Sequence, residues 1–494
     1  MSILFFKKHP HGFLAVTFSL IFLALLAFRL DLFGGGAVNP TSDTSDTGTF
    51  VNRNAWMDIL QRDRKVGYVH RQLDMTDMGY RFRESILMRV NTMGLVQEVR
   101  VLTEGDLDPD LTLSAFRMEL LSGLFRYRVR GVVNGRLLTL HVGTPPREEK
   151  VEITLQDKLY SLASIHETVV RENLGVGGRK TFQVFDPLTL THRPFLVGVL
   201  GEEKMTVLGR EEKVKKVSLD FMGTRQYAWL AEDGSVAKEE GFLGITLVRV
   251  EKEEALSGYA SAMTEDLTEA ASVASDVLIA EAPALKRLKV RVEGVEGLEA
   301  FLDGGRQTLK GRVLTVEKES TDDRLQGASD RVPSGEDVKK YLEDEPLIQS
   351  RDPVIRAQAR EIVRPGDPAR VRAEKLVSWV YRNIRKRPVL SVPNAVETLK
   401  NLQGDCNEHA VLLAALARAA GIPADVEAGL VYQNGRFYYH AWNTLFLGRW
   451  VTADATLGQL PADVTHIRLT RGLDSQADLI GVVGKIRLKI LEQE

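Results

Sequence analysis

Alternating apolar and polar residues, interrupted by turn sequences, run through residues 56–250 and constrain the fold more than any other feature of the chain. Such alternation is typical of strands with one buried face, and short turns make successive strands pair antiparallel. Asn134-Gly135, for example, separates strand patterns at 126–133 and 136–142 and is typical of two-residue hairpin turns. With one helical pattern near 159–172, the region predicts a curved antiparallel sheet, a sandwich or a half-barrel.

This β-rich region contains no group of His, Asp and Glu residues with the spacing of metal ligands. Two interpretations of it remain open. It is either a scaffold, or a sheet that binds an apolar ligand or a partner. Its sequence alone predicts no chemistry.

Helical patterns return in the last third of the chain. Asp352-Pro353 and Asp367-Pro368 are each typical of a helix start, with a capping side chain followed by a proline. Asn394 has the capping role for a third, shorter helix. A fourth helix is predicted to begin next to Cys406 and to stop at Gly421. Cys406 is therefore expected in the first turn of a helix.

Cys406 is the only cysteine of the chain, which excludes an intrachain disulfide and any site built from several cysteine ligands. At a helix start, unpaired N–H groups and the helix dipole stabilise a thiolate. Cysteines in such positions have pKa values of roughly 3.5–7.5, against about 8.5 for a free thiol. The alternative is a small buried core residue, the common fate of a free cysteine. The helix-start position favours a reactive thiol.

After this helix the hydrophobic period changes from 3.6 to 2 residues, which predicts strands at 424–433, 436–447 and 449–456. His440 lies on the second of these strands and Asp454 on the third, where cross-strand pairing can bring the two side chains together. Taken singly, they are typical of a core histidine and a turn carboxylate. Taken in order with the only cysteine, they predict a relay of nucleophile, base and orienting group.

Four motifs in this region, which occur in the right order, resemble the transglutaminase-like domain superfamily: GDCNEHA at 404–410, RAAGIPA at 418–424, YHAW at 439–442 and GRWVTADAT at 448–456. The resemblance implies an α+β domain with the papain-like arrangement, a helix packed against an antiparallel sheet. It also implies that Cys406 is the nucleophile, His440 the base and Asp454 the orienting residue. Ala455 stands where the family usually has proline, a change that affects the local turn and leaves these three residues intact.

The same resemblance implies acyl transfer through a thioester, with a protein or peptide amide as substrate. The backbone N–H of Cys406 and the side chain of Gln403 are candidates for the oxyanion donors. His409 is expected either to have a structural role or to support the catalytic residues from the next layer of side chains. Members with a membrane anchor more often look hydrolytic, so the first hypothesis is a cysteine protease or amidase. A cross-linking acyltransferase and a non-catalytic binding or assembly module are the alternatives. No metal and no cofactor are expected, because no acidic loop resembles a calcium site and no nucleotide-binding motif occurs.

An uncharged, apolar run at 12–28 is just long enough to span a bilayer, and Lys7 and Lys8 precede it. By the positive-inside rule, this pattern predicts a single-pass anchor in the inner (cytoplasmic) membrane, with the bulk of the chain on the periplasmic, extracytoplasmic side. This matches the bacterial membrane-anchored type of the superfamily. The alternative is a signal peptide that is cut within 34–38.

The net charge of −2 and the lack of a basic block argue against a nucleic-acid partner. The expected partners are a protein or peptide substrate and the membrane. Changes in composition divide the chain into five predicted parts: an anchor or signal segment (1–33), a flexible tether (34–52), an antiparallel β-rich domain (53–250), a helical connector with a short β segment and a charged linker (251–349), and a transglutaminase-like catalytic domain (350–494).

Overall fold

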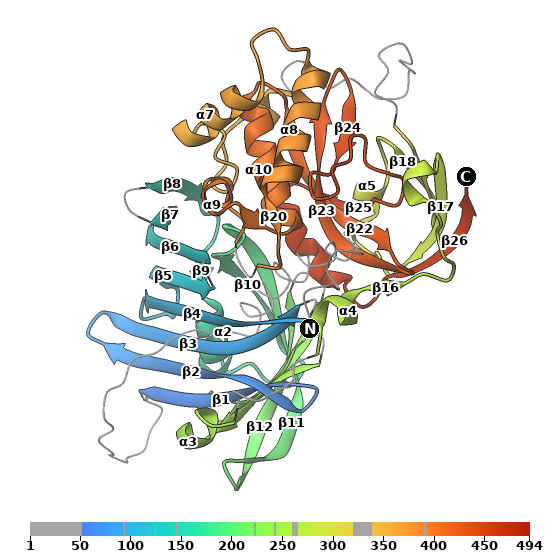
Figure 1. Cartoon of the computed structure of the whole chain (residues 1–494). Helices are drawn as coiled ribbons and strands as arrows, with labels where there is room; N and C mark the ends of the chain where they lie inside the picture. Colours follow the sequence, from blue (N-terminus) through green and yellow to red (C-terminus); the bar gives the residue numbers. More distant parts are fainter. Residues whose placement is uncertain are drawn as a thin grey trace, which may run out of the picture. The chain divides into compact units, whose positions relative to one another are not determined.

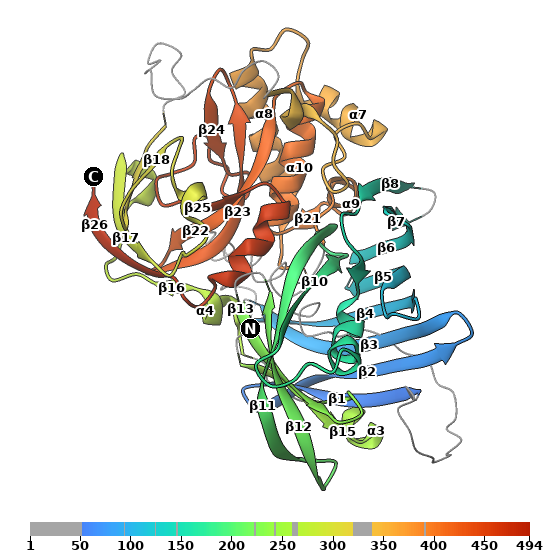
Figure 2. The same cartoon turned by 180° about the vertical axis from the view of Figure 1, so that it is seen from behind.

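The computed structural model describes residues 52–92, 94–123, 125–144, 147–221, 224–241, 244–258, 265–319, 338–389 and 392–494. The described residues form two compact units, 52–266 and 267–494 (Figures 1 and 2). The predicted anchor at 12–28 and the tether up to residue 51 lie outside the described residues. Within the described ranges, no helix combines the length and the apolar character that a membrane crossing requires.

One large sheet dominates the first unit. Over the described residues it has fifteen strands in the order β8-β7-β6-β5-β4-β3-β2-β1-β15-β14-β13-β12-β11-β10-β9, antiparallel except for the β9–β10 pair. The strands are β1 (Arg53–Gln61), β2 (Arg64–Thr76), β3 (Gly79–Thr92), β4 (Leu95–Leu107), β5 (Leu113–Ser122), β6 (Phe125–Asn134), β7 (Leu137–Thr144), β8 (Arg147–Thr154), β9 (Leu159–Tyr160), β10 (Arg179–Asp186), β11 (Thr191–Val207), β12 (Arg210–Phe221), β13 (Thr224–Ala231), β14 (Val236–Glu240) and β15 (Ile245–Val250). The predicted antiparallel β region is thus confirmed.

The sheet is bent, with β10–β12 running at a steep angle to β1–β8 in both views (Figures 1 and 2). Alternation decides which side chains are buried: along β4, every second residue from Val99 to Leu107 is buried. The predicted helix is α2 (Leu162–Arg171), which buries Ile165 and Val169, and a short α3 (Lys252–Ala255) follows β15. Between α2 and strands β1–β3 lies a cavity of about 600 Å³ that is lined by charged residues of both signs.

The predicted hairpin at Asn134-Gly135 forms, with its turn one residue later than expected. Asn134 still pairs with Leu137, so Gly135 and Arg136 make the turn between β6 and β7. Gly135 has a φ of +60°. A glycine with positive φ at the first turn position is what a type II′ hairpin turn requires.

The second unit contains both helices and strands. Its helices are α4 (Leu267–Ala271), α5 (Glu299–Leu302), α7 (Pro353–Ile362), α8 (Ala369–Asn383), α9 (Ala395–Asn401) and α10 (Cys406–Ala419), with short 3₁₀ helices at Ala282–Ala284, Lys340–Leu342 and Asp474–Gly481. Its strands are β16 (Val273–Ala274), β17 (Arg287–Glu293), β18 (Gln307–Lys310), β19 (Val313–Glu317), β20 (Arg385–Lys386), β21 (Gln403–Gly404), β22 (Ala424–Gln433), β23 (Arg436–Phe446), β24 (Trp450–Ala453), β25 (Ile467–Arg471) and β26 (Arg487–Gln493).

Helix α10 packs on a sheet in which β16, β23, β22 and β25 follow one another and β24 pairs with β23. Helices α7–α10 gather on one side of β22–β24 (Figure 1). The α10 residues from Cys406 to Arg418 are all buried, because this helix lies between the sheet and the other three helices. Asn434 and Gly435, with φ values of +49° and +87°, make the predicted two-residue turn between β22 and β23. The second unit is therefore α+β, as predicted.

A smaller sheet in this unit corrects one expectation. The strand pattern within 475–494 predicts a final strand that pairs with the compact unit at about 350–472. The strand exists as β26, but it pairs with β17 in a separate sheet of order β18-β19-β17-β26. Part of the predicted connector 251–349 therefore belongs to the fold of the second unit. Within 251–282, where the sequence predicts a helical connector, the described residues form the α-helices α3 and α4, and Val273 instead pairs with Phe437.

Helix starts follow the predicted caps in two of three cases. Asp352 accepts a hydrogen bond from the backbone of Val354 (2.8 Å), and Asn394 accepts one from Glu397 (3.0 Å). Asp367 instead accepts from the backbone of Arg364 (2.8 Å), so its carboxylate closes the preceding turn and does not cap α8.

Candidate active site

Cys406 is the first residue of α10, and the start of this helix is closed by a capping box. Glu408 accepts a hydrogen bond from the backbone N–H of Asp405 (3.0 Å). The chain can approach Glu408 so closely because residue 404 is glycine: a Cβ at Gly404 would lie 2.3 Å from the Cβ of Glu408. The sulfur of Cys406 is thereby held at the positive end of the helix dipole.

His409 lies one helical turn after Cys406 and supports the same helix start. Its Nδ1 is hydrogen-bonded to the backbone carbonyl of Asp405. Burial is the main cause that lowers the pKa of His409 to about 4, so the ring is neutral near pH 7. This geometry agrees with the structural role expected for His409.

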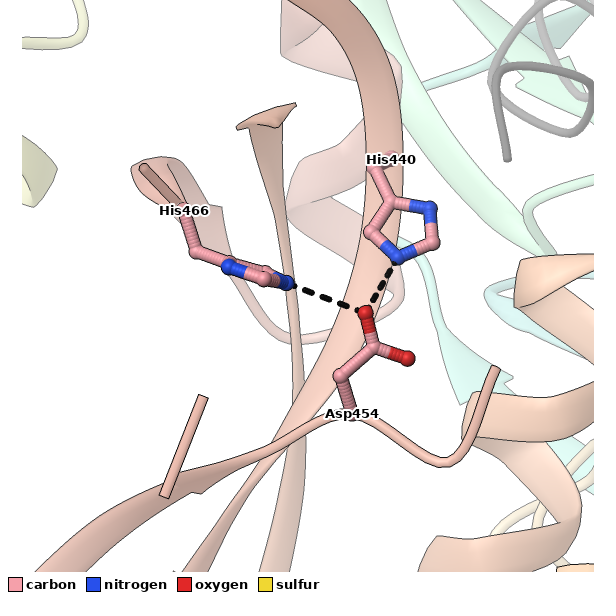
Figure 3. A group of neighbouring side chains, drawn as sticks. All are labelled: His440, Asp454 and His466. Carbon is pink, nitrogen blue, oxygen red and sulfur yellow. Dashed lines mark hydrogen bonds and ion pairs between the residues drawn. The ribbon is translucent and has the colours of Figure 1, made fainter. Parts of the chain in front are cut away.

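His440 and Asp454 come from β23 and from the residue after β24, and their side chains are in direct contact. Nε2 of His440 lies 2.6 Å from Oδ2 of Asp454, and both side chains are fully buried (Figure 3). The pairing of Asn443 with Ala453 brings the two strands into register at this point. The contact proposed from cross-strand pairing is therefore present.

The other oxygen of Asp454 is fixed by the backbone. Oδ1 accepts hydrogen bonds from the N–H groups of Thr456 (2.7 Å) and Leu457 (2.9 Å). These bonds form across a turn that contains Ala455, so alanine at the usual proline position still allows the carboxylate to be held. Burial alone would raise the pKa of Asp454, but the charges and hydrogen bonds of the neighbouring histidines outweigh it and lower the pKa, so Asp454 is ionised.

Cys406, at the start of α10, is the third member of the group with His440 and Asp454. The backbone N–H of Ala441, the residue after His440, donates to the Cys406 sulfur (3.1 Å). Burial would lower the pKa of His440, but attraction to Cys406 and Asp454, with the hydrogen bond to Asp454, raises it to about 9. With Nε2 of His440 bonded to Asp454, Nδ1 is the nitrogen that can exchange a proton with the thiol. The arrangement can therefore hold a thiolate beside an imidazolium.

A second histidine, His466, shares the carboxylate of Asp454. Its Nε2 lies 3.0 Å from the same Oδ2 that binds His440, and its side chain is fully buried (Figure 3). Sequence reasoning missed this residue, because it belongs to none of the motifs. The available signal was its place directly before a strand, β25, that pairs with β22 beside β23.

Gly429 makes this arrangement of strands possible. It lies on β22 opposite His440 on one side and opposite Arg468 on the other, where the pairing with β25 changes register. A Cβ on Gly429 would lie 2.0 Å from the backbone oxygen of Ile467. Only glycine therefore allows β25 to come close enough to place His466 next to Asp454.

Trp442 and Glu427 form a buried, hydrogen-bonded pair next to the histidine rings. Trp442 lies in an edge-to-face contact with His466, with ring centroids 5.1 Å apart, and its Nε1 donates to Glu427 (3.0 Å). Burial would raise the pKa of Glu427, but Arg471 and Arg468 lower it to about 2. Trp442, which is fully buried, is thus part of the core that orients the site.

The donor atoms of His440, Asp454 and His466 lie within 4.8 Å of one another, and two imidazoles with one carboxylate are a set that Zn²⁺ or Fe²⁺ can use. The hydrogen bonds at the site oppose metal binding. An ion would have to displace the protons that both imidazole rings donate to Asp454. The contacts fit a charged proton-transfer site better than a metal centre.

Comparisons with known proteins give one family match and several distant structural similarities. Residues 356–455 match the model of the transglutaminase-like superfamily. Among solved structures, a β-barrel-like protein of unknown function from Brucella abortus is 13% identical, with a TM-score of 0.33 over 41% of this chain and 97% of that one. A candidate cysteine protease from Cytophaga hutchinsonii is 17% identical, with a TM-score of 0.28 over 42% of this chain and 89% of that one. No curated protein matches the chain.

The chain therefore carries a transglutaminase-like domain at residues 356–455, inside the second unit. This domain contains the helix start with Cys406, the strand with His440, and Asp454. His466 lies beyond the matched residues.

Proposed function

We propose that the chain is a cysteine enzyme that acts on amide bonds of protein or peptide substrates through a thioester, as a peptidase or amidase. The observation that carries the proposal is the contact of His440 with Asp454 at 2.6 Å, with Cys406 against the same imidazole from the start of α10. A non-catalytic module has no need for a buried, charged group of this kind, because burying charges is costly. The reaction steps that follow use only groups of this chain.

In the acylation step, the Cys406 thiolate attacks the amide carbonyl carbon, and the carbonyl electrons move to oxygen. The backbone N–H of Cys406 and the side chain of Gln403, which is 8% exposed on β21, are candidates to stabilise that oxyanion. The tetrahedral intermediate collapses, the C–N bond breaks, and Nδ1 of His440 gives its proton to the departing amine. A thioester on Cys406 remains.

In the second step, His440 takes a proton from water while the water oxygen attacks the thioester carbonyl. The C–S bond breaks, the carboxylic acid leaves, and the thiolate–imidazolium pair forms again. An amine in place of water would instead give a new amide and a cross-linked product. Both outcomes use the same three residues, so the acyl acceptor decides between the peptidase and the acyltransferase.

We also propose that residues 12–28 anchor the chain in the inner membrane, with the bulk of it on the extracytoplasmic side. Lys7 and Lys8 ahead of the apolar run support this topology. In intact spheroplasts, added protease should digest the region after residue 34. Protection of that region would overturn the topology and leave the proposed chemistry untouched.

The catalytic proposal is tested with purified full chain in detergent and a library of peptides, by mass spectrometry of the products. Cleavage by the wild type, its loss in Cys406→Ala, and its persistence in EDTA support the proposal. Added primary amine shows the acceptor: a product with the amine incorporated indicates transamidation. Binding of peptides by both wild type and Cys406→Ala, without any turnover, would favour the binding module.

A further inference from the structure

Both ring nitrogens of His466 face oxygen atoms that only accept hydrogen bonds. Nε2 lies 3.0 Å from Oδ2 of Asp454, and Nδ1 lies 3.2 Å from both Oδ1 and the backbone carbonyl of Asp463. A neutral imidazole has one N–H and one lone pair, so one of its nitrogens would set a lone pair against these oxygens. The imidazolium form donates at both nitrogens and satisfies every contact.

The surroundings of the ring agree with a positive charge on it. Burial would lower the pKa of His466, but the charge of Asp463 and hydrogen bonds to Asp454 and Asp463 raise it to about 9. The charged groups that face the ring directly are therefore two carboxylates and the His440 ring, whose centroid lies 5.9 Å away. Arg306 donates to the backbone carbonyl of His466 (2.9 Å), and its guanidinium also lies 3.7 Å from the carboxylate of Glu319. Arg468 lies 3.4 Å from Glu427. Each of these cations is thus paired with an acid.

We propose that His466 is a protonated positioning residue that weakens the hold of Asp454 on the proton of His440. The inference rests on the proposed function, in which His440 must give its proton to the leaving amine. Asp454 alone would stabilise the His440 imidazolium strongly and make it a poor acid. His466 counters this in two ways, because it competes for the same Oδ2 and because its charge repels that of His440.

The size of the effect follows from the separation of the rings. Two unit charges 5.9 Å apart at an effective dielectric constant of 20 repel enough to lower a pKa by roughly 2 units. Cys406 and Asp454 raise the pKa of His440 to about 9, and a positive charge on His466 acts against this rise. Without the charge on His466, His440 would release its proton only at still higher pH.

Two variants remove the charge by different routes. His466→Gln keeps an N–H donor for Asp454 but carries no charge. Asp463→Asn leaves the histidine in place and removes the carboxylate that stabilises its second proton. In each, the alkaline limb of kcat/KM against pH should move up by about 0.5 to 2 pH units, and kcat at pH 7 should fall several-fold. Thr470→Val, an equally buried change on β25, should leave the limb where it is.

The direction of the shift separates this role from a merely structural one. If His466 only kept Asp454 in place, its loss would loosen the Asp454–His440 contact, and the alkaline limb would move down. A downward shift, or an unchanged limb in both variants, would overturn the inference. The thermal midpoint of each variant shows whether it folds. If His466→Gln does not fold, Asp463→Asn alone tests the inference.

A spectroscopic titration tests the same inference without any substrate. In full-length protein labelled with ¹³C at the histidine Cε1 position, the His466 signal should keep its imidazolium shift up to pH 8. The His440 signal should titrate at higher pH in His466→Gln than in the wild type. If no peptide is cleaved, the proposed function is wrong. The titration still shows whether His466 is charged, because it needs no substrate. A neutral His466 at pH 7 would overturn the inference even if peptides are cleaved.

Discussion

Nε2 of His440 lies 2.6 Å from Oδ2 of Asp454, with both side chains fully buried. A hydrogen bond between charged groups in such a place is short and strong because water does not compete for it. It fixes the ring so that Nδ1 is left for Cys406. The orientation of His440, and with it the chemistry proposed for the site, therefore depends on one carboxylate.

Replacing Asp454 by asparagine tests this dependence. The amide keeps the shape but loses the charge that helps to raise the pKa of His440, so that pKa should fall below about 9. We expect kcat to drop by about 10²–10⁴-fold and the alkaline limb of kcat/KM to move to lower pH. A variant with wild-type kcat would contradict the orienting role of Asp454.

Reactivity of the thiol follows from the same pair. Because the pKa of His440 is raised to about 9, the imidazolium is present at pH 6 and can hold a thiolate beside it. Native protein should therefore react with iodoacetamide at Cys406 at pH 6 much faster than the same chain unfolded in urea. His440→Ala should slow the native reaction at least several-fold. Equal rates in native and unfolded chain would identify Cys406 as an ordinary buried thiol.

Stability of the second unit should depend on pH on the alkaline side. The pKa values of His440 and His466 are both raised from 6.5 to about 9 by folding, so the stability they contribute is full below about pH 6.5. It is lost as the pH rises through about 9. The thermal midpoint of this unit should fall between pH 6.5 and 9, and fall less in His466→Gln. A flat midpoint over that interval would show that the two rings are not charged partners of Asp454.

Gly429 offers a test of the packing that places His466. A Cβ at this position would lie 2.0 Å from the Ile467 backbone oxygen, so Gly429→Ala must push β25 away from β22. We expect a loss of about 1–3 kcal/mol in the free energy of unfolding, measured by urea denaturation. The alkaline limb of kcat/KM should also shift, since His466 moves with β25. Gly435→Ala, in the turn at the end of the β22–β23 hairpin, provides a comparison in which the site stays in place.

Local patterns predicted much of the site. Cys406 at a helix start, the two-residue turn at Asn434-Gly435 and the strand that carries His440 are all set by residues close in sequence. Capping, turn chemistry and hydrophobic period act over a few residues, so a single sequence contains them. The contact of His440 with Asp454 could be predicted for the same reason, because a short turn joins the strand of His440 to the strand before Asp454.

Non-local pairing accounts for what was missed. β26 pairs with β17 across some two hundred residues, and no turn sequence indicates such a partner. His466 is near Asp454 only because β25 pairs with β22 through the register shift at Gly429. A short alternating pattern shows that a strand exists and which face is buried, but it does not name the neighbouring strand.

The central claim is that Cys406 forms a covalent acyl intermediate, and intact-protein mass spectrometry after an acid quench measures this most directly. Full-length protein is mixed with a peptide that it cleaves and is quenched during turnover. The account predicts an adduct equal in mass to the acyl part of the peptide, located on Cys406, removed by hydroxylamine and absent from Cys406→Ala. Turnover without any such adduct, or an adduct that persists in Cys406→Ala, would contradict it.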